Sequence, residues 1–468
     1  MTKKITPLAL ALVTLLTGCS MIPTYERPAA PVPTGFPNVA ASESPATLPS
    51  WRTYFAEPRL QQLIELALNN NRDLRIASLN VEQARAQFQV RRAAQYPAVG
   101  LAANASRATA SGTGNITNNF SVGLAVTAWE LDFFGRVASL KEQALAQYLA
   151  TEEGRNAAQV SLISSVANGW LNLLADEELL ELSRRTLATR EESVRLTKLR
   201  LDSGAASELD YRQAESLAQA ARTTLAQQQR QRALDENALA LLLGQPLPED
   251  IRATLGRSDL NAAPAMQTVP AGLPSDLLVQ RPDIRQAEQQ LIAANANIGA
   301  ARAAFFPRIS LTAQAGTSSG ELSGLFKNGS WGFTLAPSLL LPLFDAGANQ
   351  ANLESAQASR GVAVAQYEKA IQTAFREVAD ALASQSSLTE QLEAQRKQAE
   401  AESIRFKLAD LRYQNGVASY LDLLDAQRSL FSTQQGVVQV RLSQLQNQVS
   451  LFKALGGGWT DETSSAKP

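Results

Sequence analysis

The sequence repeats itself at an almost constant shift over most of its 468 residues. Asp73 matches Asp283 and Pro97 matches Pro307, both at a shift of 210 residues. Beyond Phe344 the matching positions lie 212 residues apart, so one two-residue insertion separates the two registers. A repeat of this length corresponds to a complete structural half of the protein. The chain is therefore a tandem duplication.

The first residues carry the pattern of an export signal. Lys3 and Lys4 precede a short apolar run, and small residues lead up to Cys19. The run is too short to span a bilayer, and the pattern is typical of a secretory signal peptide over residues 1–18. The residues before Cys19 resemble the lipobox of bacterial lipoproteins, which implies lipid attachment at Cys19. Because Ser20 follows in place of Asp, the resemblance further implies the outer membrane. The alternative is a signal peptide with a chance cysteine.

Composition removes most classes of enzyme and of metal site. The chain has no histidine and one cysteine, which excludes His/Cys zinc sites and catalytic triads or dyads that need an imidazole. We find no phosphate-binding glycine loop, and 43 basic residues balance 44 acidic ones without a basic stripe for nucleic acid. Paired carboxylates remain possible among the 44 acidic residues, but nothing places two of them in a recognisable apolar pocket. We therefore predict a protein that is not an enzyme and has no cofactor, metal site or nucleic-acid partner.

Two long segments without proline predict the helices. No proline stands between Pro97 and Pro246, or between Pro342 and Pro468. Apolar residues recur there at steps of three and four, which predicts helices over about 136–202 and 348–414, each on the order of 100 Å long. A shorter helix follows each turn, so each half contains a long antiparallel helical hairpin. Helices alone fit a coiled-coil stalk as well as a tube.

Before each long helix the apolar period changes from about 3.6 to two. Runs of ten or more residues alternate between apolar and polar or small side chains, and they pair into hairpins at about 98–132 and 308–345. This length and alternation suit transmembrane strands with one lipid face and one lumen face. The alternative is a pair of soluble hairpins that cap the helices.

Four strands cannot close a barrel, and unpaired strand edges are not tolerated in hydrocarbon. Two copies of the chain supply eight strands, whose interior side chains fill, whereas three copies supply twelve and leave a lumen. We therefore predict a homotrimer with a 12-stranded β-barrel continued by an α-barrel of long helical hairpins. The fold class is mainly α with a transmembrane β portion.

The predicted segments follow the duplication. A lipid-anchored, proline-rich strap over 19–55 precedes the first repeat at 56–245, with a disordered linker as the alternative to an extended strap. An equatorial linker over 246–272 joins it to the second repeat at 273–456, and a C-terminal tail covers 457–468.

Six blocks of the sequence carry a resemblance to a known family. They are Trp129-Glu130-Leu131-Asp132-Phe133-Phe134-Gly135-Arg136, Ala271-Gly272-Leu273-Pro274-Ser275-Asp276-Leu277-Leu278, Arg281-Pro282-Asp283-Ile284, Ala294 to Pro307, Tyr420 to Ser429 and Lys453 to Trp459. These blocks resemble the outer membrane factors of the TolC type, and more closely the lipidated branch of drug-efflux channels. The resemblance covers essentially the whole mature chain. It implies a trimeric barrel on a helical tunnel, located in the outer membrane with a long periplasmic extension, that exports toxic compounds with a periplasmic adaptor and an inner-membrane transporter.

A conduit through the outer membrane must stay shut at rest, and the helical turns are the closable end. Gly204 and Gly416 suit the left-handed position that ends a helix. Leu421 and Asp425 are four residues apart on one helical face, so threefold symmetry makes each a ring. In the family, leucine and aspartate at the matching positions constrict the mouth, and we also assign Asp422 to this constriction. The alternative for Asp425 is an ordinary solvated carboxylate.

Two further predictions concern the same turns. The dipeptides Gly204-Ala205 and Gly416-Val417 are predicted to contact the adaptor, because they form the loops at that end of the chain. The basic side chains near the ends of the long helices, Arg200 and Arg412, are predicted to form ion pairs with neighbouring carboxylates.

Three functional interpretations follow from the sequence: a drug-efflux conduit, an exit duct for a secreted protein or a metal ion, and a non-conducting trimeric stalk. The stalk gives no reason for the alternating strands. Metal transport is favoured by methionine or histidine along the path, but the mature chain has only Met21 and Met266 and no histidine.

Overall fold

The computed structural model describes residues 20–36, 50–109, 116–257, 260, 266, 278 and 280–457. Parts of the predicted organisation lie outside these ranges, among them the signal peptide, Cys19, residues 458–468 of the tail, and residues 258–259, 261–265 and 267–272 of the equatorial linker. Two compact units share the chain and are described separately. The sheet unit comprises Met1–Ala30, Ser78–Gly154 and Asp283–Ala370, and the turn unit comprises Pro31–Ala77, Arg155–Pro282 and Ile371–Pro468.

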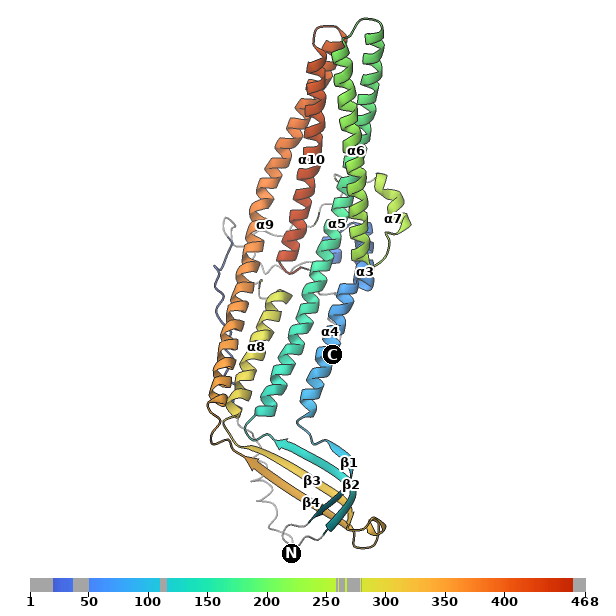
Figure 1. Cartoon of the computed structure of the whole chain (residues 1–468). Helices are drawn as coiled ribbons and strands as arrows, with labels where there is room; N and C mark the ends of the chain where they lie inside the picture. Colours follow the sequence, from blue (N-terminus) through green and yellow to red (C-terminus); the bar gives the residue numbers. More distant parts are fainter. Residues whose placement is uncertain are drawn as a thin grey trace. The chain divides into compact units, whose positions relative to one another are not determined.

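The sheet unit contains one antiparallel sheet of four strands within the described residues, in the order β1-β2-β3-β4 (Figure 1). The four strands that the alternation predicts are thereby confirmed. Each half of the duplication supplies one hairpin, and the two hairpins join where β2 pairs with β3. The strands are β1 (Val99–Thr109), β2 (Ile116–Leu131), β3 (Arg308–Ser319) and β4 (Trp331–Leu340).

The sheet has one apolar face and one face of small, polar side chains. Paired residues share a face, as Leu335 does with Ala313, and the hydroxyls of Ser310 and Ser338 confirm this for the polar face because they lie 2.8 Å apart. The apolar face is exposed in the chain, with Trp331 and Phe333 at 69% and 74% exposure. Strands β1 and β4 are the edges of the sheet and have no further strand partner in the described chain.

The sheet unit also contains helical segments. These are the end of α4 (Arg72–Ala93), nearly all of α8 (Pro282–Ala303) and the beginnings of the two long helices. The short helix η4 (Leu322–Gly324) lies between β3 and β4. The N-terminal segment contacts α8: Asn295 donates its side-chain N–H to the carbonyl of Pro23 at 2.8 Å, and Arg27 forms a forked pair with Glu288 at 2.7 and 2.6 Å. These contacts support a strap rather than a loose linker over residues 21–27.

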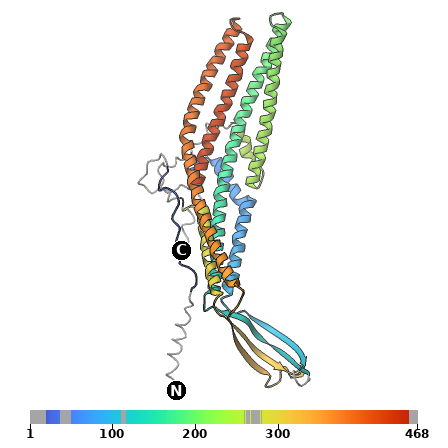
Figure 2. The ribbon, with the colours of Figure 1, turned by 60° about the vertical axis from the view of Figure 1, so that its left-hand side comes forward.

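The long helices end where the sequence predicts. Helix α5 covers Arg136–Asp202 and α9 covers Ala348–Gln414. Each turns back into a shorter helix, α6 (Glu208–Leu243) or α10 (Tyr420–Ala454), and the two hairpins stand out in both views (Figures 1 and 2). The turn unit also contains α2 (Trp51–Tyr54), α3 (Pro58–Asn70), α7 (Glu249–Thr254) and η1 (Leu255–Arg257).

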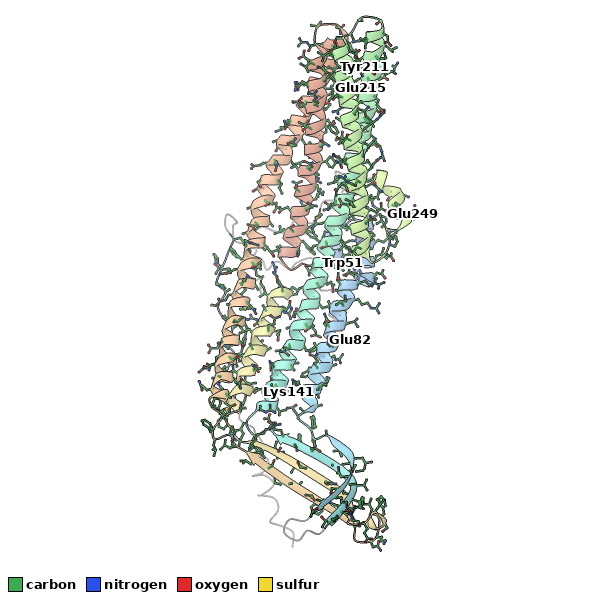
Figure 3. All side chains as sticks on the ribbon, viewed as in Figure 1. Trp51, Glu82, Lys141, Tyr211, Glu215 and Glu249 are labelled. Carbon is green, nitrogen blue, oxygen red and sulfur yellow. The ribbon has the colours of Figure 1, made fainter. Side chains whose placement is uncertain are left out.

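The core of the turn unit gathers aromatic side chains from both repeats. Tyr54 stacks on Phe452 with ring centroids 4.3 Å apart, and the indole N–H of Trp170 donates to the carboxylate of Glu57 at 2.9 Å. Trp51, labelled in Figure 3, is 1% exposed. Residues 51–54 of the predicted strap instead form the helix α2, because Trp51 and Tyr54 are buried in this core. The predicted strap therefore extends too far along the sequence.

None of the helices in the described part of the chain is both long and apolar enough to cross a membrane. Among the same residues, no group of three or more Cys, Asp or Glu side chains is arranged to hold a metal ion.

Candidate functional site at the helical turns

Both helical turns of the turn unit end their long helix with the same backbone motif. Gly204 and Gly416 have φ angles of +74° and +72°, which confirms the predicted left-handed conformation. The amide of Ala205 donates to the carbonyl of Arg200 at 2.7 Å, and the amide of Val417 donates to Arg412 at 2.9 Å. The glycine amides donate three residues back, so each turn is a Schellman motif that satisfies the last carbonyls of its helix.

The returning helices begin with equivalent capping boxes. Ser207 and Ser419 each accept from the backbone N–H three residues on, and Asp210 and Asp422 each accept from the serine backbone N–H in return. Asp422 also accepts from the hydroxyl of Ser419 at 2.8 Å. The carboxylate of Asp422 is thus engaged in its cap, an arrangement repeated in the other half, and this gives it a structural role besides the constriction that we predicted for it.

An aromatic cluster joins the two hairpins close to their turns. Tyr420, Leu423 and Leu424 of α10 are buried against Ala214 of α6. Tyr413 lies against this cluster, and its ring centroid is 5.3 Å from that of Tyr420. Tyr211 and Glu215 of α6, labelled in Figure 3, also lie close to the turn of their hairpin.

Arg200 reaches this cluster rather than a carboxylate. Its guanidinium carbon lies 4.8 Å from the centre of the Tyr413 ring. Within the described residues, neither Arg200 nor the exposed Arg412 forms an ion pair with a carboxylate. Within the chain, the tyrosine face next to Arg200 provides a cation–π contact that links the two hairpins, and the ion pairs of Arg200 and Arg412 stay a prediction.

Asp425 has a partner that the sequence analysis missed. Its carboxylate accepts from the guanidinium of Arg405, which also pairs with Glu402 at 3.1 Å and approaches the hydroxyl of Ser429 at 3.4 Å. Asn415 directly precedes the turn glycine, and Arg405 and Asp425 lie equally far from it on either side in the sequence. Residues placed in this way face each other across an antiparallel hairpin. This symmetry about the turn was the signal available in the sequence.

The side chains that we predict for the constriction are presented to the outside of the chain. Leu421 is 56% exposed, and the side chain of Asp425 is also 56% exposed despite its ion pair. Leu209, the counterpart of Leu421 in the first repeat, is 66% exposed. The predicted adaptor-contact residues, Gly204, Ala205, Gly416 and Val417, are exposed as well.

A groove of about 470 Å³ runs between α5 and the second hairpin at this level. Both apolar and polar side chains line it, among them Leu196, Arg200 and Tyr420. The side-chain oxygen of Gln427, which also lines the groove, is buried without a hydrogen-bond partner among the described residues. The groove therefore offers polar groups as well as apolar surface.

A sequence model of outer membrane efflux proteins matches residues 63–245 and 273–457. The chain is 47% identical to the antibiotic efflux pump outer membrane protein ArpC of Pseudomonas putida, over 100% of this chain and 98% of that protein. It is 48% identical to the solvent efflux pump outer membrane protein SrpC of the same species, over 95% of this chain and 97% of that protein.

A solved structure gives the same assignment. The open state of the MtrE outer membrane channel of Neisseria gonorrhoeae superimposes with a TM-score of 0.85 at 41% sequence identity. The match covers 94% of this chain and 99% of that channel.

Proposed function

The chain belongs to the outer membrane efflux protein family, and we propose that it is the passive, gated outer membrane conduit of a tripartite efflux pump. Three copies form the conduit. The cargo is small toxic molecules, such as the antibiotics and solvents that the names of its relatives ArpC and SrpC specify. Family members are channel proteins rather than enzymes.

The observation that carries this proposal is the two-faced sheet with two unpaired edges. The edge strands β1 and β4 each carry unused backbone donors and acceptors, which hydrocarbon does not tolerate. Pairing β4 of one copy with β1 of the next removes both edges, and three copies give twelve strands. The apolar face then meets lipid and the small polar face lines a lumen.

The gate of this conduit lies at the α9–α10 turn. In a threefold assembly Leu421 forms an apolar ring and Asp425 an acidic ring one helical turn further along α10. The ion pair with Arg405 fixes the Asp425 carboxylate on its own hairpin. Opening requires the second hairpins of the three copies to move apart. Because Arg405 and Asp425 belong to the same hairpin they move together, and without Arg405 the three Asp425 carboxylates lose their compensating charges and repel one another more strongly.

The remaining parts of the pump attach at defined places on the chain. The exposed turns at Gly204-Ala205 and Gly416-Val417 contact a periplasmic adaptor, which links the conduit to an energised inner-membrane transporter. The N-terminal lipid on Cys19 holds the strap in the outer membrane, where several acyl chains make the anchor stable.

The test is conductance of the purified, lipidated protein in planar bilayers, for wild type, Asp425→Ala and Arg405→Ala. We expect a small, mostly closed wild-type current that rises in both variants. Asp410→Ala, at a half-buried carboxylate of the same hairpin, is the matched control and should keep the wild-type current. Stable trimers that never conduct would leave only the stalk, and an unchanged current in Asp425→Ala would remove the gate from this ring.

A further inference from the structure

The polar face of the sheet is almost free of charge. The described strands contain three charged residues: Arg107, Glu130 and Arg308. Arg107 shares the apolar face of β1 with Leu101, close to the β1–β2 turn. Glu130 and Arg308 remain, and both lie at the end of the sheet where the helices begin.

A β-bulge turns Glu130 onto the polar face. Between Val126 and Trp129 strand β2 advances by one residue more than β3, and Ala128 there has a φ of +48°. A one-residue shift exchanges the two faces of a strand. Before the bulge the even-numbered residues of β2 from Phe120 to Val126 are apolar and share one face of the strand. After it, Trp129 takes the apolar side, and Glu130 pairs with Ser310 on the polar side.

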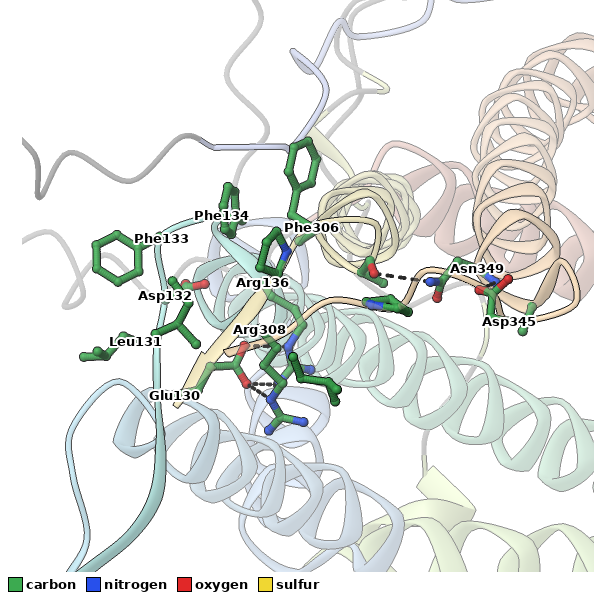
Figure 4. A pocket seen from close by; sticks show the side chains of 17 residues that line it. Glu130, Leu131, Asp132, Phe133, Phe134, Arg136, Phe306, Arg308, Asp345 and Asn349 are labelled. Atoms are coloured by element: carbon green, nitrogen blue, oxygen red, sulfur yellow. Dashed lines mark hydrogen bonds and ion pairs between the residues drawn. The ribbon is translucent and has the colours of Figure 1, made fainter. Parts of the chain in front are cut away.

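Two arginines hold the carboxylate of Glu130 (Figure 4). Arg136, the first residue of α5, donates to it through Nε at 2.8 Å and Nη2 at 2.6 Å, and Arg308 donates through Nε at 2.8 Å. The side chain of Glu130 is 11% exposed, that of Arg136 is 34% exposed and that of Arg308 is 57% exposed. The charge that this cluster presents to solvent is therefore the positive charge of Arg308.

The nearby carboxylates are engaged elsewhere. Asp132 accepts from the backbone N–H of Ala138 in the first turn of α5 at 2.7 Å, and Asp345 accepts from the backbone of Gly347 and Asn349 at the beginning of α9. The cluster lines a pocket of about 340 Å³ in the sheet unit together with Phe133, Phe134 and Phe306.

The second repeat lacks the cluster. At the shift of 210 residues, Glu130 corresponds to Leu340, Arg136 to Ala346 and Arg308 to Ala98. Each chain therefore supplies one cluster, on the inner strands β2 and β3, where pairing at the edges of the sheet does not cover it.

We propose that Arg308, held by the bulge-positioned Glu130 and by Arg136, forms a positive collar that sets the charge preference of the lumen. This inference rests on the proposed function, because three copies are needed to make the collar a ring. Rings of charged side chains select ions by sign, and arginine rings favour anions. The substrates it favours are anions and molecules with an anionic group, while the neutral remainder of the polar face leaves apolar solutes unhindered.

The test is the reversal potential in a potassium chloride gradient across planar bilayers. All variants carry Asp425→Ala, which removes the acidic ring of the gate from the path. Against that background, Arg308→Gln should lower the chloride-to-potassium permeability ratio by about twofold or more, and Glu130→Gln should raise it. Arg308→Lys keeps the charge and should keep the ratio.

The double variant Glu130→Gln with Arg308→Gln is the matched control, because it loses one charge of each sign. Its ratio should return close to that of the background, which a general loss of structure does not produce. If Glu130→Gln fails to assemble, Arg308→Gln and Arg308→Lys decide the question, since Arg308 is the most exposed member of the cluster.

Two failures are distinguishable. Background trimers that do not conduct at all remove the proposed conduit itself. Conducting trimers whose permeability ratio is the same with Arg308→Gln overturn the collar and leave the conduit intact, and the cluster is then only a brace between β2 and α5.

Discussion

Replacing Asp176 with asparagine should remove a pH dependence from the hairpin of α5 and α6. Asp176 is 6% exposed, and Asp235 of α6 hydrogen-bonds to it. Burial, the Asp235 carboxylate and the neighbouring Glu177 raise the pKa of Asp176 from 3.8 to about 7, against the opposing effect of Arg232. The folded hairpin therefore retains a proton that the unfolded chain releases.

The sign and the size follow from this difference. Because the folded state holds the proton more tightly, the stabilisation is fully present below about pH 4 and is lost as pH rises to about 7. At 1.36 kcal/mol per pKa unit, the upper limit of the loss is about 4 kcal/mol. Screening by solvent at the edge of the Asp176–Asp235 pair reduces this loss of stabilisation, and we expect a loss of about 2 kcal/mol.

Hydrogen exchange of the folded trimer measures this locally. After correction for the intrinsic exchange rate, protection of amides around Asp176 and Asp235 should fall by about thirtyfold between pH 4 and pH 8 in the wild type. In Asp176→Asn it should stay level, because the amide keeps a hydrogen-bond donor for Asp235 without a charge. Asp380→Asn, at an exposed carboxylate of α9, serves as control. An equal fall in Asp176→Asn and in wild type would refute the reasoning.

Two further predictions concern glycines. Gly416→Ala places a Cβ at a φ of +72° and should destabilise the α9–α10 turn by about 1–2 kcal/mol, which faster proteolysis at the turn would show. Gly361→Ala is the control, because a Cβ there meets open space on α9, and it should be neutral or stabilising. Gly299→Leu should displace the strap, because a Cβ at residue 299 stands 2.7 Å from a side-chain carbon of Ile22. Glu288→Gln should loosen the strap less, because it only weakens the contact of residue 288 with Arg27. Unchanged protease resistance of residues 20–30 in both variants would argue against a docked strap.

The sequence predicted those features that local chemistry determines. The absence of proline, the apolar period and the turn glycines placed both ends of α5 and α9 correctly, since each is a property of a few consecutive residues. The alternation gave the four strands for the same reason. The left-handed glycines at 204 and 416 followed from their position after a helix.

The features that were missed depend on contacts between segments. Arg405 finds Asp425 only when the hairpin has formed, and Arg200 turns to Tyr413 only when the two hairpins pack together. The bulge at Ala128 has no local signal, because alanine rarely adopts a positive φ and nothing in its neighbours requires one. Pairing with β3 imposes it, and Thr312 accepts from the Ala128 amide at 3.2 Å.

The two halves of the duplication agree where the backbone must turn and differ where we propose function. Schellman glycines and capping boxes recur in both hairpins, because every helical turn has the same unsatisfied backbone groups. Asp425 and Arg405, by contrast, correspond to Gln213 and Ser193. The cluster at Glu130 likewise has no counterpart in the second half. A threefold assembly of duplicated chains is close to sixfold in its backbone, so a charge present in one half only makes a ring of three rather than six. Three like charges on a ring repel one another less than six charges on a ring of the same circumference. The first hairpin of each chain also lacks the Arg405–Asp425 pair of the gate. The divergence of the halves therefore lets one hairpin move at the gate while the other keeps the wall of the tube.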